Sequence, residues 1–444
     1  RFLVNSMQKI NVITLGCAKN RVDSEHIAAQ LAAMGYQILF DSDRTDAKIV
    51  VINTCGFIGD AKQESIDTIF EAVNAKNAGL IDRLFVIGCL SERYADYLRE
   101  QIPEVDDYFG ARDLSGVVKA LGGEYNSDST ARELSTPKHY AYLKISEGCN
   151  WRCGYCAIPG IRGKHISVPM ERLIEEAESL AAAGVKELMV IAQDTTYYGM
   201  DLYGERKLAE LLEKLCRIKG IEWIRLHYAY PVDFPQDVID VMAREPKICK
   251  YLDIPLQHIS DNQLSLMHRR HTKAEAIELL NRLRAAIPNI AIRTTMLVGY
   301  PNESAEDFEE LCEFVKETRF DRAGVFTYSR EEDTPAYDFP DQIDEQIKQD
   351  RMDVLMRTQM NINTARNESR IGSVIQVLCE AYDPVGECYY GRSLEDAPDI
   401  DGKVFFRYNA VENERLAPGS LLYVKIREVV DYDVYGFAMK SDAT

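Results

Sequence analysis

The stretch Ser146–Cys156 reads SEGCNWRCGYC and sets Cys149, Cys153 and Cys156 at the spacing C-x3-C-x2-C. Cysteine thiolates are the usual ligands of iron–sulfur clusters, and a four-iron cluster normally takes four of them. This loop offers three, so a four-iron cluster bound to it would keep one iron open for a substrate or a cofactor. The spacing therefore predicts a cluster that takes part in chemistry and does more than carry electrons.

A zinc site is the alternative for the same cysteines, with a fourth ligand from elsewhere such as His139 or His165. Paired C-x2-C motifs, or a C-x2-C followed by H-x3-5-H, would be typical of zinc, and the sequence contains neither. We therefore favour the iron–sulfur cluster.

The segment around this loop, from about His139 to Met360, alternates β-rich and helical runs. The β-rich runs are Ala141–Ser146, Glu187–Ala192, Trp223–Tyr228, Tyr251–Pro255, Ile290–Leu297 and Ala323–Tyr328. The helical runs include Met170–Ala183, Leu208–Cys216, Pro235–Ala243, Lys273–Ala285 and Ala305–Thr318. Six such units predict a complete or partial TIM-type barrel, with the cysteine loop directly after its first strand.

Polar residues stand at the C-terminal ends of the predicted strands of this barrel, where catalytic groups gather in such folds. They are Gln193, Asp194, His227, Tyr228, Gln257, His258, Arg293 and Tyr328. Gly299 opens a turn after the fifth strand and would let the backbone approach a ligand closely. A structural hydrogen bond at the barrel rim, or a plain strand-to-helix connection, explains each of them equally well.

A second set of cysteines lies in the segment from about Ile10 to Ser135, where three β-branched runs each lead to a cysteine. These are Cys17, Cys55 and Cys89, with helical runs between them at Asp23–Met34 and Asp60–Ala75. Alternating strands and helices predict a parallel sheet, and the ends of its strands meet at one edge. Each cysteine alone would more often be a core residue, but together they predict a second three-cysteine cluster.

The third segment, from about Ile371 to Ala438, contains short β-rich runs and predicts a small antiparallel barrel. The runs are Val374–Cys379, Lys403–Phe406, Leu421–Ile426 and Val434–Met439. From Ile371 onward the chain has 13 acidic and 7 basic residues, a balance of −6. A groove for nucleic acid should be basic, so the balance favours a basic protein partner, or a barrel that only stabilises the fold.

Length and composition agree with a multidomain enzyme of the cytoplasm. The chain has 444 residues and is 46% hydrophobic, enough for two or three cores. We find no signal peptide and no apolar run long enough for a membrane span. Eleven cysteines without a leader suit a reducing compartment, and five of them (Cys216, Cys249, Cys312, Cys379 and Cys388) stand alone and are expected to be buried. The net charge of −19 disfavours nucleic acid as the main substrate.

The C-x3-C-x2-C loop closely resembles that of the radical S-adenosylmethionine (SAM) enzymes. The resemblance implies that SAM binds the open iron of a 4Fe-4S cluster on Cys149, Cys153 and Cys156, and that reduction cleaves it to a 5′-deoxyadenosyl radical. An aromatic residue before the third cysteine lies near the adenine in that family, and Tyr155 has this position. The further SAM contacts that we expect are Gln193, Asp194, Arg293 and Gly299.

The whole chain resembles the radical SAM methylthiotransferase family. That family implies an α/β architecture: a parallel-sheet cluster domain (8–135), a radical SAM barrel (136–368) and a TRAM β-barrel (369–444). The motifs Thr14–Asn20, Asn53–Ile58 and Asp253–His258 are similar to those of the branch that modifies a ribosomal protein. The branch that modifies adenosine in transfer RNA is the alternative, and a non-catalytic iron–sulfur sensor is a weaker one.

The resemblance implies that a methylthio group replaces a hydrogen on the β-carbon of an aspartate. The aspartate belongs to the twelfth protein of the small ribosomal subunit, taken free or within the ribosome. One SAM supplies the radical, an auxiliary 4Fe-4S cluster on Cys17, Cys55 and Cys89 holds the sulfur, and a second SAM donates the methyl group. The hydrogen is too inert for a side-chain base, which is why a radical cofactor is needed. An electron-donor protein such as a flavodoxin or ferredoxin must supply electrons, and no membrane is involved.

Overall fold

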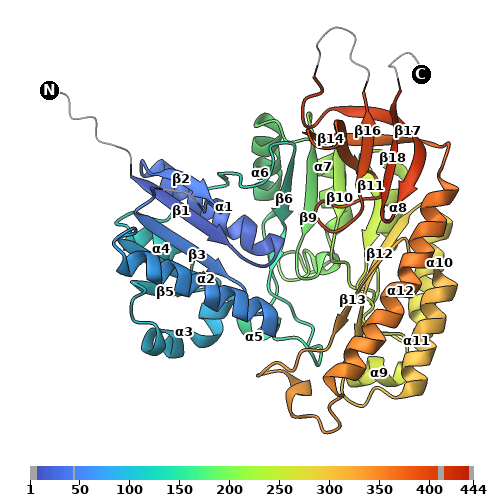
Figure 1. The fold of residues 1–444 in the computed structure, drawn as a ribbon, viewed down its shortest axis with the longest axis horizontal. Coiled ribbons are helices and arrows are strands. Elements are labelled where there is room, and N and C mark those ends of the chain that lie inside the picture. The colour runs from blue at the N-terminus through green and yellow to red at the C-terminus, as the bar shows by residue number, and fades with distance from the viewer. Residues whose placement is uncertain (1–7, 44–45, 409–414, 440–444) are drawn as a thin grey trace.

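The computed structural model describes residues 8–43, 46–408 and 415–439. These residues form an N-terminal sheet with its helices, a larger central sheet with its helices, and a C-terminal barrel (Figure 1). In Figure 1 the N-terminal sheet lies at the left and the C-terminal barrel at the upper right. No helix among the described residues is long and apolar enough to cross a membrane.

The N-terminal sheet has five parallel strands in the order β2-β1-β3-β4-β5. The strands are β1 (Lys9–Thr14), β2 (Gln37–Phe40), β3 (Ile49–Thr54), β4 (Arg83–Gly88) and β5 (Asp107–Gly110). The helices are α1 (Ala18–Ala33), α2 (Gly59–Asn77), α3 (Cys89–Gln101) and α4 (Leu114–Ala120). Ile49 and Val51 of β3 enter one core while Val50 and Ile52 enter another, so helices cover both faces. The predicted parallel sheet is confirmed, and β2, β5, α3 and α4 are additions to it.

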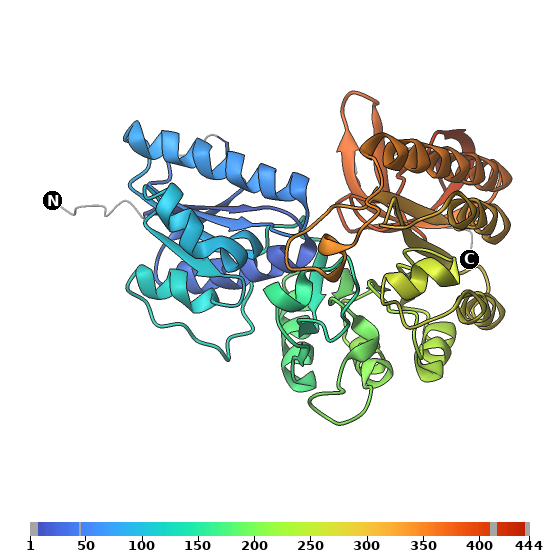
Figure 2. The same cartoon turned by 90° about the horizontal axis from the view of Figure 1, so that it is seen from below.

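The central sheet has six parallel strands in the order β13-β12-β11-β10-β9-β6 and is open between β6 and β13. Of the two predicted forms, the structure has the partial barrel (Figure 2). The strands are β6 (Tyr140–Lys144), β9 (Glu187–Ile191), β10 (Trp223–Leu226), β11 (Ile248–Asp253), β12 (Ala291–Val298) and β13 (Arg322–Thr327). The covering helices are α6 (Met170–Ala182), α7 (Leu208–Cys216), α8 (Gln236–Arg244), α10 (Lys273–Ala286), α11 (Ala305–Thr318) and α12 (Glu345–Ser369).

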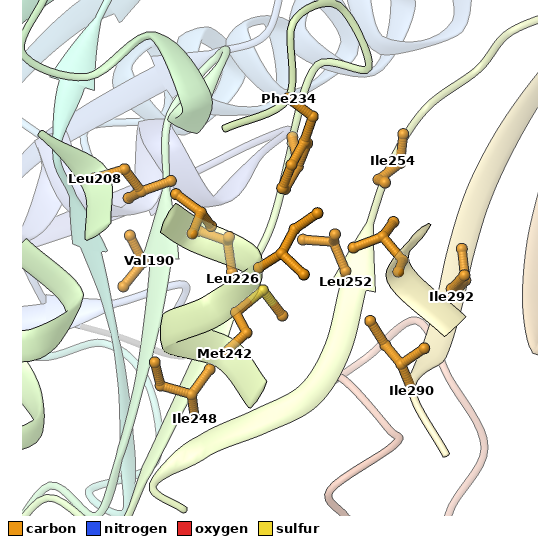
Figure 3. Packing of buried hydrophobic residues seen from close by; sticks show 14 of the residues in the cluster. Val190, Leu208, Leu226, Phe234, Met242, Ile248, Leu252, Ile254, Ile290 and Ile292 are labelled. Atoms are coloured by element: carbon orange, nitrogen blue, oxygen red, sulfur yellow. The ribbon is translucent and has the colours of Figure 1, made fainter. Parts of the chain in front are cut away.

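Apolar side chains of the strands and of these helices fill one continuous core. Leu226 and Leu252 from neighbouring strands pack with Met242 of α8 (Figure 3). Short elements connect the main ones: β7 (Ser146–Glu147), β8 (Ile166–Ser167), α5 (Ile158–Ile161), α9 (Asp261–Leu266), and the 3-10 helices η1 (Thr195–Tyr197) and η2 (Pro335–Asp338). Such a core fixes where each strand ends, and the strand ends carry the candidate site.

The C-terminal barrel is closed, with strands in the order β14-β15-β16-β18-β17. They are β14 (Val374–Asp383), β15 (Cys388–Ser393), β16 (Val404–Arg407), β17 (Leu421–Val430) and β18 (Asp433–Ala438). The predicted small barrel is confirmed, with β15 as an additional strand. Four of its pairings are antiparallel and the β16–β18 pairing is parallel, so the barrel is not antiparallel throughout.

The barrel packs against the edge of the central sheet where the strands begin. Trp223 and Ala291, the first residues of β10 and β12, share an apolar cluster with Leu378 and Ala397 of the barrel. Beside them Glu187, the first residue of β9, pairs with Arg225 (2.8 Å) and with Arg392 of the barrel (2.6 Å). This contact is at the opposite edge of the sheet from the cysteine loop.

Several acidic residues of the barrel are used inside this contact. Asp396 pairs with Arg322 at 2.5 Å, Glu380 pairs with Arg392 at 2.6 Å, and Asp401 lies 3.8 Å from Arg293. The balance of −6 therefore overstates the negative charge that the barrel can offer to a partner.

Candidate functional site

The loop that carries Cys149, Cys153 and Cys156 runs between β7 and α5, at the edge where β6 ends. Gly148 in front of it has φ +78°, and a Cβ there would stand 2.2 Å from the backbone oxygen of Lys164, so only glycine fits. The Cys149 N–H donates to the oxygen of Gly163 at 3.0 Å, which closes the loop. The three thiols are thereby held by backbone contacts before any metal binds.

The thiols of this triplet are close enough to influence one another's ionisation. Burial raises the pKa of Cys149 to about 12, and the neighbouring Cys153 adds to the rise. Burial, followed by the charges of Cys153 and Cys149, also raises the pKa of Cys156. Thiols of this kind stay protonated in water at neutral pH and lose the proton when they bind a metal.

An aromatic and cationic frame surrounds the triplet. The ring of Trp151 stacks on Tyr230 with centroids 4.3 Å apart, and its Nε1–H donates to Asp194 at 2.7 Å. Arg269 lies 4.2 Å above Tyr230 and donates to the Cys153 sulfur (3.7 Å) and to the Tyr155 hydroxyl (3.3 Å). Asp194 and Tyr155 thus both belong to the frame around the loop.

The cysteines of the N-terminal sheet converge at the edge where its strands end. Cys17 caps α1 after β1, Cys55 follows β3, and Cys89 begins α3 after β4. A Cβ on Gly16 would stand 2.7 Å from the Cys55 Cβ, and one on Gly56 would stand 2.7 Å from the Cys89 carbonyl. Glycines at these two positions let the three chain segments come together.

The pKa shift of Cys89 also indicates that the cysteines of the second triplet lie close together. Burial raises the pKa of Cys89 to about 11; the charge of Arg162 opposes the rise and those of Cys17 and Cys55 add to it. Asn20 holds the segments in place, since its Nδ2 donates to the backbone oxygens of Leu15 (2.9 Å) and Thr54 (3.0 Å). We conclude that Cys17, Cys55 and Cys89 form one group, as the strand pattern predicted.

The two triplets approach each other at the contact between the N-terminal and central sheets. Cys89 packs in a small apolar cluster with Ala111, Ala157 and Ile161, and Ala157 directly follows Cys156. One residue step therefore separates a cysteine of the first triplet from a side chain that touches the second.

Arg162 crosses the same contact and was not predicted from the sequence. Its guanidinium, 2% exposed, donates to Asp23 (2.7 Å), to Glu147 (2.9 Å) and to Asn20. Lys144 pairs with the same two carboxylates. Burial alone would raise the pKa of Glu147, but Lys144 and Arg162 outweigh it and lower the pKa to about 2. Buried ion pairs of this kind fix the two sheets in one arrangement.

Other predicted residues have clear structural partners. Gln193 donates to Glu147 at 2.7 Å, which ties it to the same ionic group. His258 pairs with Glu303 at 3.1 Å in the core of the fold. Gly299 has φ +71°, and a Cβ there would clash with Lys348, so packing against α12 explains this glycine. Tyr328 follows β13, as predicted, and its hydroxyl has no hydrogen-bond partner among the described residues.

The position of Arg293 was predicted wrongly. It is the third residue of β12, not its end, and it pairs with Asp253 (3.2 Å) and reaches toward Asp401 (3.8 Å). The predicted run Ile290–Leu297 and the observed strand both extend past Arg293, so this residue lies inside the strand and not at its end. Its guanidinium is committed to these carboxylates.

The histidines of the zinc alternative do not point to the cysteine loop. His139 precedes β6, at the opposite edge of the sheet, and its Nε2 lies 3.5 Å from Glu380 of the barrel. The His165 ring instead contacts Ser167 (3.0 Å) and lies 3.6 Å from Asp201. Within the described ranges, no group of three His, Cys, Asp or Glu side chains is gathered tightly enough to hold a single metal ion.

The two triplets suit a larger group than a single ion. The cysteines of a four-iron cluster each bind a different iron, so their sulfurs stand farther apart than the ligands of one ion. Both triplets consist of thiols alone, and glycines and backbone hydrogen bonds brace the segments that carry them; burial raises the pKa of Cys89, Cys149 and Cys156. This donor set and setting fit iron–sulfur clusters.

Comparison with family models divides the chain into the same three parts. Residues 143–315 match the radical SAM superfamily, residues 9–110 match the uncharacterised protein family UPF0004, and residues 371–439 match the TRAM domain. The first match contains Cys149, Cys153 and Cys156, and the second contains Cys17, Cys55 and Cys89.

Curated relatives match over almost the full length. A protein of Flavobacterium johnsoniae, named ribosomal protein uS12 methylthiotransferase RimO, is 50% identical over 430 residues, 96% of this chain and 97% of that relative. Proteins of the same name from Cytophaga hutchinsonii and Bacteroides fragilis are 45% and 47% identical and cover 98% and 96% of this chain, and 99% and 98% of their own.

Solved structures show a related fold. The radical SAM methyltransferase TsrM of Kitasatospora setae, with cobalamin and a [4Fe-4S] cluster bound, superposes with a TM-score of 0.58 at 14% identity, covering 74% of this chain and 77% of its own. The cobalamin-dependent radical SAM enzyme OxsB has a TM-score of 0.51 at 14% identity, covering 79% of this chain and 56% of its own. At this identity the likeness concerns the fold alone.

Proposed function

Because this chain belongs to the RimO family of ribosomal protein uS12 methylthiotransferases, we infer that it is a radical SAM enzyme that attaches a methylthio group to uS12. It uses SAM and a 4Fe-4S cluster. The transfer-RNA alternative is not favoured, because the relatives that match over nearly the full chain have uS12 in their name.

One observation carries the finer proposal: Cys89 of the second triplet shares an apolar cluster with Ala157, the residue that directly follows Cys156 of the first. We propose that the second triplet holds an auxiliary 4Fe-4S cluster and that the β-carbon of a uS12 aspartate enters between the two. When bound, SAM and the first cluster would supply the hydrogen-abstracting radical, and the auxiliary cluster the sulfur. A C–H bond would be replaced by a C–S bond, and a second SAM would supply the methyl group.

Residues of the chain have definite tasks in this proposal. Cys149, Cys153 and Cys156 hold the first cluster, and Cys17, Cys55 and Cys89 hold the second. Tyr155 and Asp194 lie in the aromatic frame at the first triplet, where SAM must bind. Gln193 is anchored by Glu147 at the same strand end, and the backbone of Gly299 completes the proposed SAM contacts. Arg293 is left out because two carboxylates occupy it.

The proposal also names domains and partners. We place the functional units at residues 8–135, 136–368 and 369–444. Cleavage of SAM consumes an electron, so a reducing protein such as a flavodoxin or ferredoxin must dock on the enzyme. Free uS12 or uS12 within the ribosome is the substrate.

The first experiment separates the two triplets. Anaerobic reconstitution should load about eight irons per chain, as expected for two four-iron sites. Changing Cys149, Cys153 and Cys156 together to Ala should remove half of the iron and abolish deoxyadenosine formation. Changing Cys17, Cys55 and Cys89 together should remove the other half, retain deoxyadenosine formation and abolish methylthio product.

The matched control changes the half-buried Cys216 and the buried Cys249 and Cys312 to Ala, which should leave the iron content at the wild-type value. Full product from the variant without the N-terminal triplet would refute the auxiliary cluster. The substrate is checked by mass analysis of uS12 and of transfer RNA after incubation with SAM. Mass gained by transfer RNA and not by uS12 would refute the substrate assignment while leaving the chemistry intact.

A further inference from the structure

Lys19 reaches from the N-terminal sheet to the strand ends of the central sheet. It is the second residue of α1, two positions after Cys17, and only 9% of its surface is exposed. Its ammonium lies 3.3 Å from the centre of the Tyr228 ring, and Tyr228 follows the end of β10. A buried positive charge therefore stands between the segment of one cysteine triplet and the edge of the sheet that carries the other.

The other cations of this contact have carboxylate partners. Lys144 and Arg162 share Asp23 and Glu147, and Lys62 pairs with Glu331 at 2.7 Å. Lys19 has no hydrogen bond and no ion pair with any residue that the structure describes, and its one close partner is the face of Tyr228. A buried ammonium is costly when no anion compensates it, and an aromatic face compensates it only in part.

The surroundings of Lys19 are positive rather than negative. Burial lowers the pKa of the adjacent His227, and the charges of Arg225, Arg293 and Lys19 lower it further. His227 is 4% exposed, and its Nε2 has no hydrogen-bond partner within the described part of the chain. The protein thus places cationic charge and an unsatisfied polar atom at this strand end, and the nearby Asp253 carboxylate is already paired with Arg293.

Tyr228, whose ring contacts Lys19, has an unusual backbone conformation. Its φ is +56°, in the left-handed region that a bulky side chain adopts only under constraint. The backbone is held there because the Thr195 N–H donates to the Tyr228 oxygen at 3.1 Å and the Tyr228 N–H donates to Asp253 at 3.4 Å. Strained residues of this kind concentrate at functional sites.

We propose that Lys19 binds the side-chain carboxylate of the substrate aspartate. This rests on the proposed function, in which the β-carbon of that aspartate meets a radical from one triplet and sulfur from the other. The carboxylate is one bond from the reacting carbon, so it must lie between the triplets, where Lys19 stands. Lys19 then selects aspartate over its amide, because asparagine would leave the buried ammonium without an anion.

SAM also carries a carboxylate, and the experiment must separate the two sources. Reconstituted enzyme is tested with uS12 and with uS12 whose modified aspartate is changed to asparagine, and the Kd of each is measured with a fluorescent label. Wild-type enzyme should bind the aspartate form at least tenfold more tightly, roughly the discrimination of one charge-assisted contact. Lys19→Met should reduce the ratio to about one, while Lys19→Arg, which keeps the charge, should retain most of it.

Lys62→Gln is the matched control, because Lys62 crosses the same contact but already has Glu331 as its partner. It should change both Kd values equally and keep the ratio. An unchanged ratio in Lys19→Met would overturn the proposal, and so would a raised KM for SAM with the ratio kept. Wild-type enzyme that leaves uS12 unmodified would instead overturn the proposed function, and the inference with it.

Discussion

The central sheet contacts other parts of the chain at two edges, and the two edges differ in whether their buried cations are paired with carboxylates. At the edge where its strands begin, against the C-terminal barrel, the buried arginines Arg225, Arg392 and Arg322 each reach a carboxylate. At the edge where its strands end, against the N-terminal sheet, Arg162 is paired but Lys19 and His227 are not satisfied. The first edge is built for stability, and the second keeps binding capacity for a ligand.

Two residues at the edge where the strands end have an unusual backbone conformation. Tyr228 and Gln257, which come shortly after β10 and β11, have φ of +56° and +73° although neither is glycine. Each such residue costs on the order of 1–3 kcal/mol and persists only where its surroundings hold it. Both residues lie at the edge where the strands end, which we call the open edge; the edge where the strands begin, whose buried arginines are paired, is the closed edge.

The largest effect should come from breaking the closed edge at Glu187. Glu187→Gln leaves Arg225 and Arg392 buried without their shared carboxylate. Removing one partner of a buried ion pair typically costs about 3–5 kcal/mol. We expect a loss of this size in the free energy of unfolding, measured by denaturant titration. Glu210→Gln is the control, because Glu210 forms exposed pairs with Lys207 and Lys214 and should change stability by less than about 1 kcal/mol. Equal losses in the two variants would show that the closed edge is not special.

The closed edge should also weaken in acid. Burial would raise the pKa values of Glu187 and Asp396, but Arg392 and Arg225 act on the first and Arg322 on the second, and each pKa falls to about 2. Because the folded pKa is below the unfolded one, about 4 for both residues, this stabilisation is complete above pH 5 and is lost as pH falls toward 2. The stability difference between wild type and the double variant Glu187→Gln, Asp396→Asn should shrink over that range. A difference that stays constant would contradict the two lowered pKa values.

A smaller effect is expected from Arg162 at the open edge. Arg162→Met leaves Asp23 and Glu147 with Lys144 as their remaining cation, so the charge is only partly uncompensated. We expect a loss of about 1–3 kcal/mol, the range for leaving a buried polar group unsatisfied. Hydrogen exchange should quicken in α1 and β7 while β10 and β11 stay protected. A loss of unfolding free energy as large as that of Glu187→Gln would show that the ion pairs at the two edges stabilise the fold equally.

The sequence predicted the strands of the central sheet and the convergence of Cys17, Cys55 and Cys89 well. Hydrophobic runs such as Glu187–Ala192 mark buried strands directly, and parallel topology brings Cys17, Cys55 and Cys89 to one edge without further information. The short strands β2 and β5 were not predicted, because a run of four residues is too short to show the hydrophobic pattern of a strand.

The partners of charged residues could not be predicted. Arg162 meets Asn20 and Asp23 across about 140 positions of the chain, and Arg269 meets Cys153 across 116. No local pattern identifies such pairs, because they depend on how the sheets dock. Arg293 was expected at the end of a strand, but it is the third residue of β12, and its carboxylate partners could not be predicted either. From the sequence, Lys19 is only a cation near Cys17. That its ammonium has no anionic partner can be seen only in the three-dimensional structure.

The smallest effect should come from the rim of the open edge. Lys62 is 22% exposed and pairs with Glu331, which Arg93 also contacts at 3.2 Å. Lys62→Gln therefore leaves Glu331 with a cation, and the loss should be about 0.5 kcal/mol, as for an exposed pair. Arg93→Met should cost more, because Arg93 is 5% exposed and also donates to the backbone oxygen of Gly56 at 2.8 Å, directly after Cys55. Thermal unfolding of the two variants side by side tests this order. If Lys62→Gln lost as much stability as Arg93→Met, the Lys62–Glu331 pair would behave as a buried ion pair. The group of buried charges at the open edge would then include Lys62 as well as Lys19.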